Sequence, residues 1–273
     1  MTPPGSYQEL TELLRGRLPK MASGQLRIAH LVLADPEGTA YRGISEAARI
    51  AEVHESSISR FASSLGLQGY PAIMELCRVW LAEQAQRARR TEDTGHESPG
   101  GVLSAALEQE QENLARTFGR LDRTAWLQAV SLLAEAKRVH VLGLRESAPV
   151  AELLARRLRA RRIGDELIDE LRGLADGDVL VAVSVRRYAA DTVRAAEHAR
   201  ERGVPVVALT DNAASPLVES AEAALFAETV GVGGFHSLTA IAALAQALGQ
   251  EVVLRRGEHD DEDDLPKTFD FYY

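Results

Sequence analysis

The hydrophobic pattern of this chain changes near residue 137, and that change limits the folds it can adopt. Three short runs, VHVLGL (139–144), DVLVAVSV (178–185) and VPVVALTD (204–211), are apolar without alternation, and amphipathic segments follow them. Such valine-rich runs are typical of parallel strands that are buried on both faces and joined by crossover helices. The second half of the chain is therefore predicted to be an α/β three-layer, doubly wound fold.

Weaker segments extend this pattern on both sides. AALFAE (223–228) is a fourth candidate strand, DELID (165–169) is a further short one, and a closing helix is expected over 236–250. Before residue 137 only helical periodicity is present, with helices expected over 102–118 and 123–136. The stretch TEDTGHESPGG (91–101) lacks apolar periodicity, so it is interpreted as a linker between two domains.

Composition places the chain among soluble globular proteins. Its 273 residues suit one large domain or two ordinary ones, and no run of 18 apolar residues predicts a membrane span. The first residues lack the features of a secretory signal, and the single cysteine, Cys77, excludes an intrachain disulfide, so a cytoplasmic location is expected.

The net charge of −9 divides into +2 for residues 1–90 (11 basic, 9 acidic) and −11 for the rest (20 basic, 31 acidic). The acidity of the whole chain therefore does not exclude a nucleic-acid partner for its first part.

Residues 45–65 have the pattern of two short helices joined by a tight connection. Ser45 is the expected N-cap of the first helix, and Ile58, Phe61 and Leu65 form a buried stripe on the second. This arrangement is typical of a helix-turn-helix, whose second helix enters the major groove of DNA. Small hydroxyls allow close approach to phosphates and base edges, although a serine-rich face can also be plain surface. The predicted DNA-binding residues are His54, Glu55, Ser56, Ser57, Ser59, Arg60 and Ser63.

The stretch SISRFASSLGLQGYPAIMEL (57–76) resembles the N-terminal domain of RpiR-type transcriptional regulators, over roughly residues 8–90. Gly66 fits a helix C-cap that needs a positive φ. The chain departs from the family at Glu52 and His54, where a glycine and a capping serine are usual. A left-handed Glu52 costs about 1 kcal/mol or more, and His54 is a poorer cap than serine. His54 and Glu55 are instead expected near the groove, where they would alter which bases are read.

RpiR-type proteins join this domain to a SIS domain, which binds phosphosugars on a five-stranded parallel sheet. The resemblance implies a helix-turn-helix domain over 1–90, a linker and coupling helix over 91–121, a SIS domain over 122–255 and an acidic tail over 256–273. In VLGLRESAP (141–149), Gly143 and Ser147 match the first ligand turn of that fold, while Arg145 replaces a small residue. Ser147 is either a phosphate ligand at a helix N-terminus or only an N-cap.

The second ligand turn departs further from the SIS pattern Ser-x-Ser-Gly-x-Thr. In SVRRYAADTV (184–193), Arg186, Arg187 and Ala189 replace the second serine, the glycine and the threonine. Either the arginines grip an anion, with Tyr188 stacking or donating, or the pocket is lost and they form structural ion pairs. Asp211 and Ser215 lie near the same edge, and Ser215 is alternatively a cap. The predicted ligand residues are Arg145, Ser147, Ser184, Arg186, Arg187, Tyr188, Thr210 and His236.

These observations favour a DNA-binding regulator over an enzyme. The expected partners are a double-stranded DNA operator and an anionic effector such as a sugar phosphate, bound by a homodimer or homotetramer. No cofactor motif and no metal-ligand pattern stands out, so neither is expected. One alternative is a sugar-phosphate isomerase, for which Glu146, Glu228 and His236 are the candidate bases. Another is a regulator whose SIS domain only oligomerises.

Overall fold

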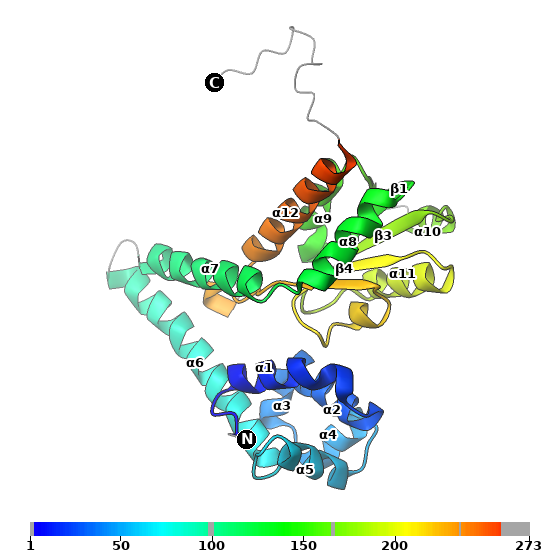
Figure 1. Ribbon diagram of the computed structural model, residues 1–273. Coiled ribbons are helices and arrows are strands. Elements are labelled where there is room, and N and C mark those ends of the chain that lie inside the picture. Colours follow the sequence, from blue (N-terminus) through cyan, green and yellow to red (C-terminus); the bar gives the residue numbers. More distant parts are fainter. Residues whose placement is uncertain (1–2, 98–100, 165–166, 235, 258–273) are drawn as a thin grey trace.

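The computed structural model describes residues 3–97, 101–164, 167–234 and 236–257. A helical N-terminal domain lies below an α/β domain, and a helical hairpin joins them (Figure 1). The helices of the N-terminal domain are α1 (Tyr7–Arg17), η1 (Leu18–Lys20), α2 (Ser23–Ala34), α3 (Pro36–Tyr41), α4 (Ile44–Ile50), α5 (Glu55–Ser64) and the first part of α6 (Tyr70–Glu97).

The predicted helix-turn-helix is confirmed in α4 and α5. Ile58, Phe61 and Leu65 are at most 1% exposed and belong to one core with side chains of α1, α2 and α6. The expected cap at Ser45 is wrong, because α4 already begins at Ile44 and its N-cap is the extended Gly43. The carbonyl of Gly43 accepts the amide of Ala47, which places Ser45 inside the first turn.

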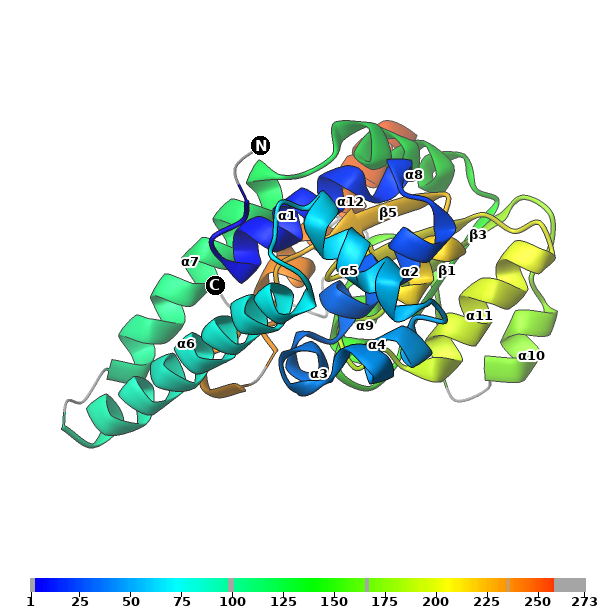
Figure 2. The same ribbon diagram turned by 90° about the horizontal axis from the view of Figure 1, so that it is seen from below.

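The linker expected over 91–101 is also wrong for most of its length. The helix α6 continues without a break to Glu97, and α7 (Gly101–Gly119) begins four residues later. These two helices form a hairpin that projects from the body of the molecule in both views (Figures 1 and 2). The helix α8 (Arg123–Glu135) follows, with Asp122 accepting two backbone amides as its N-cap.

The α/β domain contains a five-stranded parallel sheet. Its strands are β1 (Arg138–Gly143), β2 (Arg161–Ile163), β3 (Asp178–Val183), β4 (Val206–Thr210) and β5 (Ala223–Phe226), in the order β2-β1-β3-β4-β5. The register pairs Leu142 with Ala182, and Ala182 with Ala208. The chain order reverses between β1 and β3, which is therefore the topological switch point of the sheet.

Helices cover both faces of this sheet, which confirms the predicted three layers. Side chains of α8, α9 (Ala148–Arg157) and α12 (Thr239–Arg256) pack on one face, and those of α11 (Ala190–Glu201) pack on the other. Three short 3-10 turns follow strands: η2 (Arg145–Ser147), η3 (Pro216–Glu219) and η4 (Val232–Gly234). The closing helix, expected over 236–250, is α12.

The strand expected over 165–169 is wrong. The edge strand is the shorter segment Arg161–Ile163, which pairs with His140–Leu142 of β1. Residues 165–166 lie outside the described residues, and Leu167–Arg172 forms the helix α10. An edge strand needs only one buried residue here, Ile163, so it carries no apolar run that sequence reading could detect.

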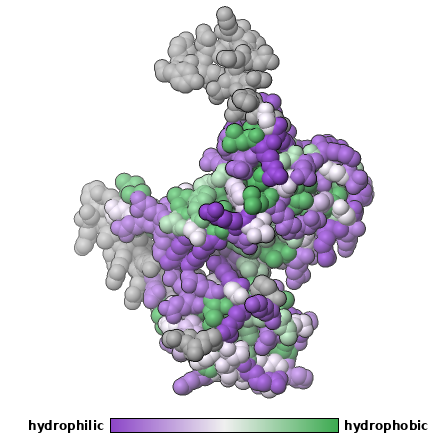
Figure 3. Space-filling view, in the orientation of Figure 1, coloured by the Kyte–Doolittle hydropathy of each residue, from purple (hydrophilic) through white to green (hydrophobic). Residues whose placement is uncertain are grey.

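Most of the face seen in Figure 3 is hydrophilic, with smaller apolar patches over both domains. Among the larger exposed apolar side chains, Val102, Leu103 and Leu107 lie near the start of α7. Exposed apolar side chains on a projecting hairpin are typical of surfaces that contact another molecule.

Candidate functional site

The turn before α5 has the strained geometry expected from the sequence. Glu52 adopts φ 51°, which confirms the left-handed position. His54 is the N-cap of α5 and makes no side-chain cap bond. The guanidinium of Arg27, which sequence reading missed, donates to the carbonyls of Ala51 (2.8 Å) and Glu52 (2.9 Å). Arg27 therefore holds the turn in a conformation that glycine would adopt without strain.

The outward face of α5 carries the predicted DNA-binding residues. All of them are exposed except Ser57, which is half-buried. Ser59 and Ser63 donate hydrogen bonds to the carbonyls four residues earlier (3.3 and 3.1 Å), and Arg60 lies 3.4 Å from the Ser57 hydroxyl. These backbone bonds keep the hydroxyls close to the helix, so Arg60 is the longest side chain on this face. The helix lies on the side of its domain that faces away from the sheet (Figures 1 and 2).

The loops after β1 and β3 flank the switch point of the sheet, where doubly wound folds bind ligands. Gly143 ends β1 at a tight approach to α9. A Cβ there would stand 2.8 Å from the Cβ of Ala151 and 2.9 Å from the carbonyl oxygen of Ser147. Only glycine allows this strand and the following turn to pack so closely.

Two arginines on these loops share an unusual backbone conformation. Arg145 adopts φ 54° and Arg187 adopts φ 51°, both in the left-handed region. Both side chains are exposed, and neither forms a hydrogen bond or ion pair with any residue that the structure describes. Strained non-glycine positions cluster at ligand sites. These arginines thus present two uncompensated guanidiniums beside the switch point.

A third guanidinium, near the end of β1, was not predicted from the sequence. Arg162, on β2, donates to the carbonyl of Gly143 at the end of β1 (3.1 Å), and its Nε lies 3.9 Å from a carboxylate oxygen of Glu152. The only sequence signal was the arginine-rich run RARRIG (159–164). Because the edge strand was predicted over 165–169, this run was not assigned to any strand.

The other polar groups of the second ligand turn are directed at a carboxylate of the chain itself. Asp211 is 6% exposed and accepts from the Tyr188 hydroxyl (2.8 Å) and the Arg186 amide (3.3 Å), while the Thr210 hydroxyl donates to the carbonyl of Ser184 (2.7 Å). Burial and the neighbouring Asp211 raise the pKa of Tyr188, so the phenol remains protonated and donates. The Ser184 hydroxyl is also engaged, accepting the amide of Ala189 at 3.3 Å.

Arg186 points toward the N-terminal domain. Its Nη2 lies 3.4 Å from the carbonyl of Leu33, in the last turn of α2, and its Nε lies 3.9 Å from Asp211. A cation at a helix C-terminus interacts favourably with the helix dipole. Arg186 therefore links the predicted ligand turn to the N-terminal domain, rather than standing free beside Arg187.

The remaining predicted ligand residues take different positions. Ser147 is buried and is the N-cap of α9, without a side-chain cap bond. Ser215 accepts the amide of Leu217 (3.4 Å), as expected for a cap. His236 forms an isolated backbone bridge with Val230, and the next residue, Ser237, donates to Glu110 of α7. This places His236 on the α7 side of the domain.

A cavity of about 600 Å³ lies at the opposite end of the sheet from these loops. Its lining includes residues that precede β1 and β2, and none of the predicted ligand residues. Within the described ranges, no three His, Cys, Asp or Glu side chains are grouped to hold a metal ion. None of the helices in the described part is both long and apolar enough to cross a bilayer.

Comparison with known proteins decides the family. A model of the rpiR-family helix-turn-helix domain matches residues 8–86, and a SIS domain model matches residues 132–249. The sugar isomerase domain of the RpiR transcription factor from Sphaerobacter thermophilus is 34% identical, with a TM-score of 0.55 over 57% of this chain and 92% of that one. The chain belongs to the RpiR family of transcriptional regulators.

Two further similar proteins span both domains. The HTH-type transcriptional regulator HexR of Escherichia coli is 28% identical over 225 residues, which cover 79% of this chain and 76% of HexR. The structure of Vibrio vulnificus NanR complexed with ManNAc-6P is 21% identical, with a TM-score of 0.54 over 90% of this chain and 91% of that one. At that identity the second similarity supports the fold alone.

Proposed function

We propose that this RpiR-type regulator senses a small anionic metabolite at the switch point of its SIS domain, and that a phosphorylated sugar is the effector class. The observation that carries the proposal is the pair of left-handed arginines, Arg145 and Arg187, on the two loops that flank the switch point; neither side chain has a partner among the residues that the structure describes. Guanidinium groups bind phosphate oxygens through two parallel hydrogen bonds. The sugar phosphate in the NanR structure agrees with this class of ligand.

DNA is read by α5 in this proposal. The supporting observations are the exposed face of His54, Glu55, Arg60 and the serines, and its position away from the sheet. One such helix contacts too little DNA for tight specific binding, so two copies of the chain are expected to read two half-sites. The exposed apolar side chains of α7 are candidates for that contact. Such a protein acts where DNA is, in the bacterial cytoplasm.

A second candidate function is a regulator whose SIS domain binds no effector. The buried carboxylate of Asp211 favours it, because this carboxylate already accepts the hydroxyl of Tyr188 and the amide of Arg186. An internal anion at that point reduces the attraction for a second one nearby.

The isomerase alternative has less support. Glu228, one of its candidate bases, lies within 3.4 Å of two guanidiniums, and His236 lies on the α7 side of the domain. Interconversion of aldose and ketose phosphates by the purified chain would establish the alternative.

Thermal unfolding against a panel of effectors tests the proposal. The panel contains hexose 6-phosphates, pentose 5-phosphates, sugar acids and inorganic phosphate. An effector at 100 times its Kd stabilises the folded chain by about 2.7 kcal/mol. A selective shift for one phosphosugar supports the proposal. If no anion in the panel raises the melting temperature, the effector-free regulator is favoured.

A further inference from the structure

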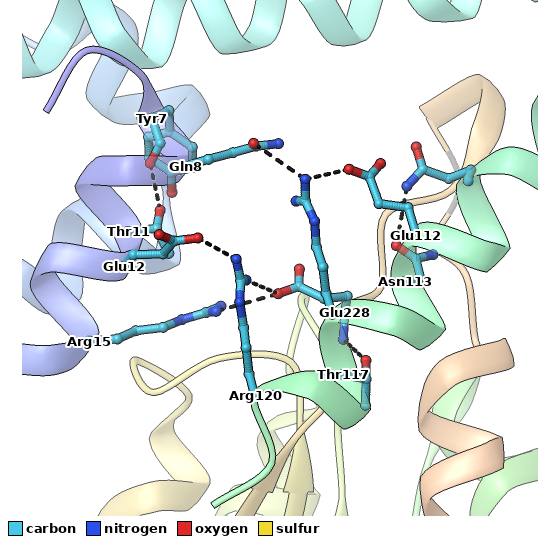
Figure 4. Close-up of polar contacts among 12 residues, drawn as sticks. Tyr7, Gln8, Thr11, Glu12, Arg15, Glu112, Asn113, Thr117, Arg120 and Glu228 are labelled. Carbon is cyan, nitrogen blue, oxygen red and sulfur yellow. Dashed lines mark hydrogen bonds and ion pairs between the residues drawn. The ribbon is translucent and has the colours of Figure 1, made fainter.

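The helix α1 has two distinct faces. Tyr7, Leu10 and Leu14 point into the core of the DNA-binding domain. Gln8, Glu12 and Arg15, spaced at i, i+4 and i+7, form a polar stripe on the other side. This stripe faces the end of α7 and the loop after β5 (Figure 4). The polar stripe of α1 is therefore one surface by which the DNA-binding domain meets the SIS side of the molecule, beside the contact of Arg186 with α2.

The end of α7 and the residue that follows it present a matching stripe. Arg116, on α7, lies 3.4 Å from the side-chain oxygen of Gln8, and Arg120, just after the end of α7, pairs with Glu12. Arg116 and Arg120 are four residues apart, as are Gln8 and Glu12 on α1, so the two pairs of side chains match in spacing. The two cations lie at the end of α7, and these two acceptors lie on α1.

Glu228 sits where these contacts converge. Its Oε1 is 3.4 Å from Nη1 of Arg15 and 3.1 Å from Nη1 of Arg120, and its side chain is only 18% exposed (Figure 4). One carboxylate from the SIS domain thus pairs with Arg15 of the DNA-binding domain and with Arg120, which also pairs with Glu12. Without the Glu228 carboxylate, Arg15 and Arg120 would lose the acceptor that they share across the domain boundary.

The backbone beside Glu228 is fixed to α7. The amide of Glu228 donates to the hydroxyl of Thr117 (2.9 Å), and the side chain of Asn113 donates to the carbonyl of Val230 (2.7 Å). Thr117 and Asn113 are both buried. Because its backbone is held in this way, the Glu228 carboxylate has a fixed place from which to orient Arg15.

We infer that Glu228 is a positioning residue for DNA reading: it fixes the orientation of the DNA-binding domain on the SIS domain through Arg15 and Arg120. The helix α5 lies on the opposite side of that domain and remains uncovered in this orientation. In a protein that reads two half-sites, the orientation of each reading domain sets the spacing of the two recognition helices. Loss of the Glu228 charge therefore loosens the domain and weakens binding to the full operator.

The distance between the two domains is measured first, in the full-length protein. Spin labels are placed on cysteines introduced at the exposed positions Glu37, on α3, and Glu201, on α11. The native Cys77 does not compete, because it is buried and burial raises the pKa of its thiol to about 12. Glu228→Gln keeps the shape of the side chain and removes its charge. The matched control is Glu152→Gln, which removes a carboxylate from the surface of α9.

Glu228→Gln is expected to broaden or shift the distance distribution, and Glu152→Gln to leave it as in wild type. Combining Glu228→Gln with Arg15→Gln should change the distribution little further, because the two residues act through one contact. A distribution in Glu228→Gln identical to wild type overturns the inference.

Operator affinity is the second readout, on DNA selected by the wild-type chain. A decrease of about fivefold is expected for Glu228→Gln, equivalent to about 1 kcal/mol. Unchanged affinity despite a changed distance overturns the link to DNA reading. This readout rests on the proposed function, whereas the distance readout does not. A wild-type chain that selects no DNA would therefore refute the proposed function and leave the distance result to decide the inference.

Discussion

Replacement of Arg187 by glycine is expected to stabilise the unliganded chain. The residue adopts φ 51°, and a left-handed conformation costs an L-residue roughly 1–2 kcal/mol. Glycine removes that strain. It also makes the unfolded chain more flexible, which lowers the free energy of unfolding by about 0.4–1 kcal/mol. The Arg187 side chain has no hydrogen bond or ion pair with the described residues that would be lost. The net gain is therefore about 0.5–1 kcal/mol, or roughly 1–4 °C in melting temperature.

The same substitution is expected to impair anion binding. A hydrogen bond to a charged group contributes about 1.5–3 kcal/mol, so loss of this guanidinium weakens affinity roughly tenfold to a hundredfold. Thermal unfolding with increasing concentrations of the phosphosugar that shifts the wild type measures both effects in one assay. The variant starts from a higher melting temperature and responds less to the ligand.

Arg159→Gly is the matched control, because Arg159 is exposed and adopts φ 48° at the opposite end of the sheet. It should give the same gain without ligand and a wild-type response with ligand. The reasoning is refuted if Arg187→Gly lowers the melting temperature of the unliganded chain. It is also refuted if the variant responds to the phosphosugar as the wild type does.

Three further predictions concern other residues. Arg60→Ala is expected to weaken operator binding by roughly tenfold and to reduce its salt dependence; unchanged affinity in fluorescence anisotropy would remove Arg60 from the groove. Burial lowers the pKa of His140, although Asp178 lies 3.4 Å away and opposes the shift. The free energy of unfolding therefore has its full value above the unfolded pKa of about 6.5 and decreases as the pH falls below it, because the unfolded chain binds the proton more readily. Urea unfolding between pH 8 and 5 should show this decrease, and His140→Gln should reduce it. Gly143→Ala places a methyl group 2.8 Å from the Cβ of Ala151 and should destabilise the chain by about 1–3 kcal/mol, measured in the same urea titration.

The layers of the SIS domain could be predicted because its central strands are buried on both faces. Burial of that kind requires unbroken apolar runs, and β1, β3 and β4 each have one. The edge strand β2 was misplaced because its three residues, two of them arginines, carry no such signal. The linker was misread for a related reason. Helix α6 continues into a polar segment that has no apolar stripe to reveal it.

The candidate site was predictable in position but only partly in orientation. The turns after β1 and β3 could be found from Gly143 and Ser184, and Arg145 and Arg187 lie on them. The direction of Arg186 could not be predicted, because it depends on where α2 lies relative to the sheet. Docking of one domain on another joins residues more than 150 positions apart, and no local pattern encodes that contact.

The continuity of α6 has a mechanical consequence. Its 28 residues form a rod about 42 Å long at 1.5 Å per residue. One end of this rod is built into the core around α5, and the rod also packs against α7 and η4. A tilt of about 10° moves one end of such a rod by about 7 Å relative to the other. Because successive base pairs are 3.4 Å apart, a tilt of that size would displace the domain that carries α5 by a distance of about two base pairs.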